Sequence, residues 1–188
     1  TYQKLKEQYG AEAGFYFGAA QHFFGIGLRK VAIEILMNAT EVANGSQQVL
    51  IATAYILEYW QLFEEAIKIY DQLIIENPDK LSFYRNLAWA HYQSANYQRA
   101  VDILFSSIKM NTGQQENVNL MEKAIMMNEM NAIITMHKSR LDISAIPGEL
   151  VKSLPVDLRI TLDCNIGNLG NVSVREPGGI TCSYSNSV

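Results

Sequence analysis

A repeat of 34 residues constrains this chain more than any other feature of its sequence. Aligning residues 47–80 above residues 81–114 pairs similar side chains: Ala54 with Ala88, Phe63 with Tyr97, Ala66 with Ala100, and Tyr70 with Leu104. Small residues let paired helices approach, and large residues fill the space between them. The pattern therefore predicts two successive helical hairpins. Proline disfavours helix in the residue before it, so Asn77-Pro78 ends the earlier one.

A weaker copy of the pattern lies one period upstream, in residues 13–46. Ala20 takes the small position of the first helix, and Ala32 takes that of the second. Arg29 stands where the later copies carry an aromatic residue, so this copy is degenerate at that point. We expect three hairpins, over residues 13–46, 47–80 and 81–114. The alternative is three unrelated amphipathic hairpins with fortuitous spacing.

A two-helix unit of this length with these landmarks resembles the tetratricopeptide repeat. The resemblance implies a solenoid whose first helices line a concave groove, so that side chains one turn apart on those helices are the candidate peptide contacts. These candidates are Phe17, Gln21 and Phe24 in the first hairpin, Ile51, Tyr55 and Tyr59 in the second, and Arg85, Trp89 and Tyr92 in the third.

The candidate face is rich in Tyr, Trp and Arg, the side chains that most often dominate binding energy. We expect it to bind an extended or helical segment with apolar and aromatic side chains. The alternative is that these aromatics pack inside the solenoid or against its capping elements. Some tetratricopeptide domains clamp a terminal carboxylate with lysine and asparagine. Only Arg85 and Asn86 are similar here, which argues against such a clamp.

Composition narrows the classes of function. The chain has 188 residues, of which 48% are hydrophobic and 18% charged, as in a soluble globular protein. A formal net charge of −4 gives no basic surface for nucleic acid. No apolar run reaches the roughly 18 residues of a membrane span, so we expect no membrane insertion. The sequence starts at Thr1 without a signal-peptide pattern, and we expect a piece of a longer protein.

Residues suited to catalysis or metal binding are sparse. His22, His91 and His137 stand far apart, without the spacing that places two ligands on one helix face. The glycines of residues 167–170 lack the lysine and the following helix of a phosphate loop. We expect no catalytic residue, no metal site and no cofactor. Cys164 and Cys182 are compatible either with a disulfide or with two separate thiols.

The rest of the chain divides by composition. Residues 1–12 are expected to end an upstream helix, and residues 115–140 to form a capping helix or helix pair. That stretch holds five of the seven methionines, and a plastic docking surface is its alternative role. Residues 141–155 form a connector. Apolar and polar residues then alternate from Val156 to Leu162, which begins a β segment over residues 156–188.

The expected fold class is thus mainly α: a tetratricopeptide-like solenoid of about three hairpins and a capping helix, followed by a small three-stranded antiparallel β segment. A turn rich in glycine and asparagine leads from the first strand to the second, near Val174, and Pro177-Gly178-Gly179 joins the second strand to the third, near Cys182.

A second resemblance covers nearly the whole chain. It is carried by residues 29–36, 83–88, 129–134 and 154–159, and by Glu176-Pro177-Gly178-Gly179 with Cys182-Ser183-Tyr184-Ser185. These stretches resemble the C-terminal region of large bacterial proteins with VIT and von Willebrand factor type A modules. Relatives carry an Asp-x-Asp cluster before the second strand. Residues 165–171 have only Asn, Gly, Ile and Leu, so no cation site is expected there.

The sequence therefore favours a protein-protein interaction scaffold rather than an enzyme. Its partner is a protein or peptide segment, including an intramolecular one from flanking modules. The alternative is that the β segment is the recognition or adhesion element at the cell envelope and the helices are a spacer. Localisation stays open between bacterial cytoplasm and cell envelope.

Overall fold

The computed structural model describes residues 2–110, 116–153, 173–175 and 181–183. The chain divides into two units, Thr1–Leu154 and Pro155–Val188. The helices are the only regular secondary structure in the described part of the first unit, which contains all the candidate contacts.

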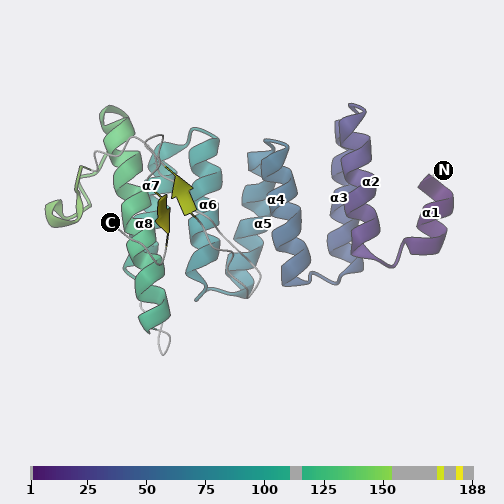
Figure 1. Cartoon of the computed structure of the whole chain (residues 1–188), viewed down its shortest axis with the longest axis horizontal. Coiled ribbons are helices and arrows are strands. Elements are labelled where there is room, and N and C mark those ends of the chain that lie inside the picture. The colour runs from purple at the N-terminus through teal and green to yellow at the C-terminus, as the bar shows by residue number, and fades with distance from the viewer. Residues whose placement is uncertain (1, 111–115, 154–172, 176–180, 184–188) are drawn as a thin grey trace. The chain divides into compact units, whose positions relative to one another are not determined.

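Six helices of the first unit pair as three hairpins, each a first helix followed by a second. They are α2 (Ala13–Gly25) with α3 (Arg29–Val42), α4 (Gln47–Tyr59) with α5 (Phe63–Glu76), and α6 (Leu81–Gln93) with α7 (Tyr97–Ile108). Each hairpin also packs on the next, through α3 on α4 and α5 on α6. The hairpins follow one another in chain order (Figure 1).

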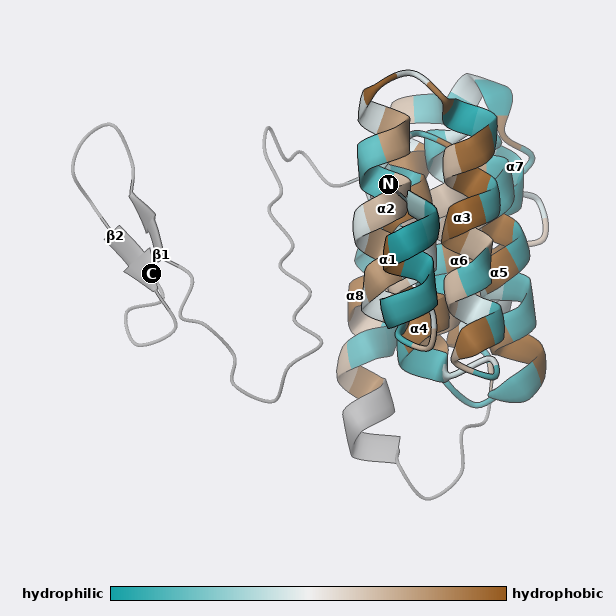
Figure 2. Cartoon of the chain, turned by 90° about the vertical axis from the view of Figure 1, so that its right-hand side faces the viewer, coloured by the Kyte–Doolittle hydropathy of each residue, from teal (hydrophilic) through white to brown (hydrophobic). Residues whose placement is uncertain are grey.

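Two further helices flank the hairpins. α1 (Tyr2–Tyr9) has no buried residue and is largely hydrophilic (Figure 2). α8 (Glu116–His137) packs on α7 and α6 and is one continuous helix. Short 3-10 turns follow, at Lys138–Arg140 and Gly148–Leu150.

The three hairpin turns share one backbone geometry. Gly27, Gln61 and Ala95 stand at equivalent positions, and all have positive φ, at 85°, 60° and 62°. After each, an amide donates to the carbonyl five residues earlier, as from Leu62 N to Leu57 O at 2.8 Å. This is the bond of a Schellman motif, which ends a helix through a left-handed residue. The sequence period therefore recurs in the backbone, even where a non-glycine residue adopts the left-handed region.

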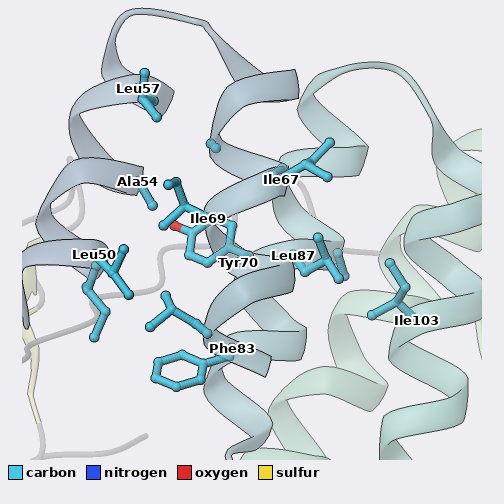
Figure 3. Packing of buried hydrophobic residues seen from close by; sticks show 14 of the residues in the cluster. Leu50, Ala54, Leu57, Ile67, Ile69, Tyr70, Phe83, Leu87 and Ile103 are labelled. Atoms are coloured by element: carbon cyan, nitrogen blue, oxygen red, sulfur yellow. The ribbon is translucent and has the colours of Figure 1, made fainter. Parts of the chain in front are cut away.

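The alanine landmarks lie in the core. First helices bury Ala20, Ala54 and Ala88, second helices bury Ala32, Ala66 and Ala100, and none of the six is more than 1% exposed. Tyr70, at 0%, is the largest of the fully buried side chains. It packs among Leu50 and Ala54 of α4 and Phe83 of α6 (Figure 3). Small residues thus admit the neighbouring helix where large ones fill the remaining volume.

The connector after α8 is tied to the helices by two amide side chains. Gln98 of α7 accepts a hydrogen bond from Asp142 N at 2.8 Å and donates one to Asp142 O at 3.1 Å. Asn131 of α8 is buried and bonds the backbone of Leu150 and Lys152. These bonds satisfy backbone groups that a connector without secondary structure leaves open.

The expected three-stranded β segment is wrong. Among the described residues the only strands are β1 (Ser173–Arg175) and β2 (Thr181–Ser183), which pair antiparallel with Val174 opposite Cys182. Residues 156–162, expected as another strand, and Cys164 lie outside the described residues. Alternation predicts that a stretch suits a strand but not that a partner strand pairs with it. The fold class that the described residues support is helical.

Candidate binding face of the first helices

The 34-residue period sorts the predicted contacts into three rows across α2, α4 and α6. The first row is Phe17, Ile51 and Arg85; the middle row is Gln21, Tyr55 and Trp89; the last row is Phe24, Glu58 and Tyr92. Equivalent positions of repeated hairpins face the same side of an array. Tyr59, a predicted contact, follows Glu58 and lies one residue beyond the last row.

The first row belongs mostly to the core. Ile51 is only 7% exposed, and Phe17 is half-buried against the hydrophobic cluster. Arg85 is held by Glu129 of α8, with Nη2 2.7 Å from Oε1 and Nε 2.9 Å from Oε2. Both side chains are mostly buried, at 13% and 15% exposure. A bidentate, charge-assisted ion pair of this kind is strong, and it leaves Arg85 poorly placed to bind an acidic ligand.

The middle row is the exposed one. Tyr55 is 42% exposed and Trp89 47%, and Gln21 is exposed as well. Trp89 stacks on Tyr92, with ring centroids 5.1 Å apart and planes 23° apart. This contact holds the exposed indole in place. Tyr59, beyond the last row, is 85% exposed.

The aromatics of the last row are packed against the protein itself. Phe24 stacks on Trp60 of the next hairpin, with centroids 4.1 Å apart and planes 3° apart. The Arg29 guanidinium lies 5.4 Å from the Phe24 centroid. Tyr92 contacts Tyr97 of α7 and His137 of α8 at centroid distances of 5.5 and 5.8 Å. Both side chains therefore join neighbouring elements of the helical array.

Glu58 completes the last row and was missed by the sequence analysis, which chose Tyr59 instead. The period itself carried the signal, since Glu58 lies 34 residues from both Phe24 and Tyr92. Its Oε1 atom is enclosed and has no hydrogen-bond partner in the described structure, and the same is true of the Tyr70 hydroxyl.

The electrostatics of Glu58 follow from that enclosure. Burial raises the pKa of Glu58 to about 7, and the nearby Tyr70 phenol offsets part of the shift. Burial also raises the pKa of Tyr70, and the Glu58 carboxylate raises it further. The two groups influence one another although no hydrogen bond within normal distance joins them. A carboxyl poised near neutrality therefore lies on the candidate face.

The histidines stay separate. His22 is exposed, His91 is half-buried, and His137 stacks on Tyr97 with centroids 3.7 Å apart. Burial, reinforced by Arg99, lowers the pKa of His91. In the part of the chain that the structure describes, no three His, Cys, Asp or Glu side chains are grouped to hold a metal ion. No described helix is long and apolar enough to cross a membrane.

The hairpins, their shared turns and their buried alanines define a tetratricopeptide-like helical repeat. No protein-family model matches the sequence, and no curated protein matches it either. Among solved structures it is similar to PcrH from Pseudomonas aeruginosa, with a TM-score of 0.46 and 13% identity over 64% of this chain and 90% of that one.

The chain is also similar to "MamA 41-end" from Desulfovibrio magneticus RS-1, with a TM-score of 0.42 and 7% identity over 74% of this chain and 83% of that one. The MamA RS-1 ArsTM double mutant gives the same values. Likenesses this distant carry no inference about what the chain binds.

Proposed function

We propose that the chain is a protein-interaction scaffold whose middle row binds a peptide or helical segment. The segment belongs to another protein or to the flanks of a longer parent chain, as the resemblance to proteins with VIT and von Willebrand factor type A modules suggests. The observation that supports this is the exposure of Tyr55 and Trp89 at equivalent positions of consecutive hairpins.

Exposed aromatics at equivalent positions suit a binding face better than a core. Tyr and Trp offer large apolar areas with a polar group at the edge, and they lose little conformational freedom when bound. Large exposed side chains that repeat along one face are typical of an interaction site. The packed first and last rows fix the helices on which the middle row stands.

An affinity pull-down from lysate of the source organism tests the proposal. The bait is wild type, the double variant Tyr55→Ala, Trp89→Ala, or the control Ile75→Ala, which removes a side chain 81% exposed on the second helix α5. A partner retained by wild type and the control but lost by a folded double variant is the expected result. A partner indifferent to the double variant would overturn the proposal.

The fold of the double variant is checked by urea unfolding. Truncation of exposed rings should change the free energy of unfolding by less than about 1 kcal/mol, whereas truncation of buried aromatics removes roughly 3–5 kcal/mol. A loss of the larger size would mean that Tyr55 and Trp89 are structural, and the proposed binding face would then be wrong.

A further inference from the structure

We infer that Glu58 makes this face specific for a partner segment that places a lysine or arginine side chain at its centre. The inference rests on the proposed function, because it assigns the chemistry of the segment that the middle row holds. It concerns a residue that the sequence analysis left out.

Glu58 lies beside the exposed middle row. It lies on α4, the first helix of the central hairpin, one turn after Tyr55 and directly before the exposed Tyr59. Residues three apart on a helix are neighbours on its surface, so Glu58 borders the middle row. Its equivalents in the other hairpins, Phe24 and Tyr92, both pack against rings of their own chain.

The Glu58 carboxylate has no basic partner in the described structure. Its Oε1 atom is enclosed without a donor, and no lysine or arginine forms an ion pair with it in the described ranges. Enclosed carboxylates are normally paired, because an unmet charge away from water is costly. Arg85, by contrast, already has Glu129. Glu58 as a residue is nevertheless partly exposed, so a basic group of a ligand that approaches it would meet a carboxylate with no charged partner in the described structure.

The surroundings favour a cation over a neutral donor. Arg85, the other charged residue of the three rows, is neutralised by Glu129, so Glu58 sets the sign of the face. Tyr55, Tyr59 and Trp89 supply exposed rings, whose negative faces attract an ammonium or guanidinium group. A segment with a carboxylate at the same place would be repelled.

The titration of Glu58 gives the binding a pH dependence. The titratable groups that act on it or on its neighbour are Tyr70 of α5, whose pKa burial raises further so that it stays neutral, and Tyr55 of α4. Burial raises the Glu58 pKa to about 7, so much of the population is protonated at neutral pH. A bound cation favours the ionised form. Affinity should therefore increase as pH rises through 7, with release of a proton.

Phage display of random heptapeptides on the full chain, held near pH 8 where Glu58 is ionised, tests the inference. Enriched peptides are synthesised and titrated against wild type, Glu58→Gln, and the double variant Tyr55→Ala, Trp89→Ala. The expected result is a shared lysine or arginine at one fixed position. Affinity should fall about tenfold on Glu58→Gln, as when one charge-assisted hydrogen bond is lost.

A change on the peptide side tests the same contact without altering the protein. Replacing the shared basic residue by norleucine should lower affinity for wild type about as much, while Glu58→Gln should bind both peptides alike. Peptides that depend on Tyr55 and Trp89 but bind Glu58→Gln as tightly would overturn the inference and leave the proposed function standing. Peptides indifferent to all these variants, or no enriched peptide, would overturn both.

Discussion

Glu58 and Asn131 are both polar side chains within the helical array, but they differ in their hydrogen bonding. Asn131 is 4% exposed and satisfied: its Nδ2 donates to Met127 O and Leu150 O at 3.0 Å, and its Oδ1 accepts from Lys152 N at 2.7 Å. The Oε1 atom of Glu58 has no hydrogen-bond partner among the described residues. A satisfied amide stabilises the fold, whereas an unmet carboxyl is tolerated where it serves something else.

The raised pKa of Glu58 predicts a stability that falls with pH. The folded protein holds this proton up to about pH 7, whereas the ordinary value of the group is 4.5, so the folded state binds more protons between these values. The free energy of unfolding of wild type should therefore decrease from pH 5 to 8 relative to Glu58→Gln. Because the group is partly exposed, we expect a relative change of about 1–2 kcal/mol.

Urea unfolding of wild type and Glu58→Gln at several pH values measures this difference. Glutamine keeps the shape and does not titrate, so other groups cancel in the comparison. Equal pH dependence of the two proteins would show that Glu58 titrates normally.

Asn131→Ala should release the connector. The substitution removes three side-chain hydrogen bonds, including those to Leu150 O and Lys152 N, and each is worth about 0.5–1.5 kcal/mol, so the free energy of unfolding should fall by about 1–3 kcal/mol. Asn128→Ala, on the exposed side of α8, is the matched control and should have little effect. Amide exchange at Lys152 reads the release directly. Unchanged protection there would contradict the assigned bonds.

Individual residues also show which contacts could not be predicted from the sequence. The candidate contacts were chosen by helical spacing from the aromatic residues, so the choice passed over Glu58 in favour of Tyr59. Spacing also could not tell which aromatics have partners: Phe24 finds Trp60 across a hairpin boundary, and Tyr92 finds His137, 45 residues along. Those partners depend on tertiary packing, which no local pattern contains.

Between elements, the close approach of paired helices depends on alanine. Ala100 of α7 is 0% exposed, so Ala100→Leu should force α7 from its neighbours and destabilise the protein by about 1–3 kcal/mol, as overpacking does. Ala124→Leu, at an exposed position of α8, is the control and should be nearly neutral. Calorimetry compares the melting temperatures. An unchanged value for Ala100→Leu would contradict the packing of this hairpin.

The Arg85–Glu129 pair should couple α6 to α8. A double-mutant cycle with Arg85→Met and Glu129→Gln, measured by urea unfolding, should give a coupling free energy of about 1–2 kcal/mol. Both side chains are mostly buried and their interaction is bidentate, which makes it stronger than a surface ion pair. Additive effects of the two substitutions would show that α8 docks through its apolar residues alone.

Elements differ in how far the sequence predicts them. The hairpins are marked by repeated alanines and aromatics, so their helices could be predicted from spacing. The length of α8 as one helix could not, because its methionines carry no repeat landmark. The β segment failed for another reason: strand alternation is a local signal, whereas pairing is a long-range event, and the described ladder joins only three residue pairs.

For the whole molecule, the proposed binding face depends on the repetition of the hairpins. An array of similar hairpins presents equivalent positions along one face, so an exposed row becomes an extended surface for a segment rather than a single pocket. The turns with positive φ at Gly27, Gln61 and Ala95 keep the hairpins alike, and the packed first and last rows keep the middle row in place. Binding should then be lost in steps as middle-row side chains are removed.

Site-specific photo-crosslinking tests the central claim most directly. A benzophenone amino acid replaces Tyr55 in one version of the protein and Ile75, on the second helix of the same hairpin, in the other. We predict that the partner retained in pull-downs crosslinks at position 55 and not at position 75. Crosslinking at position 75 alone, or equally at both, would place the contact elsewhere and contradict a binding face on the first helices.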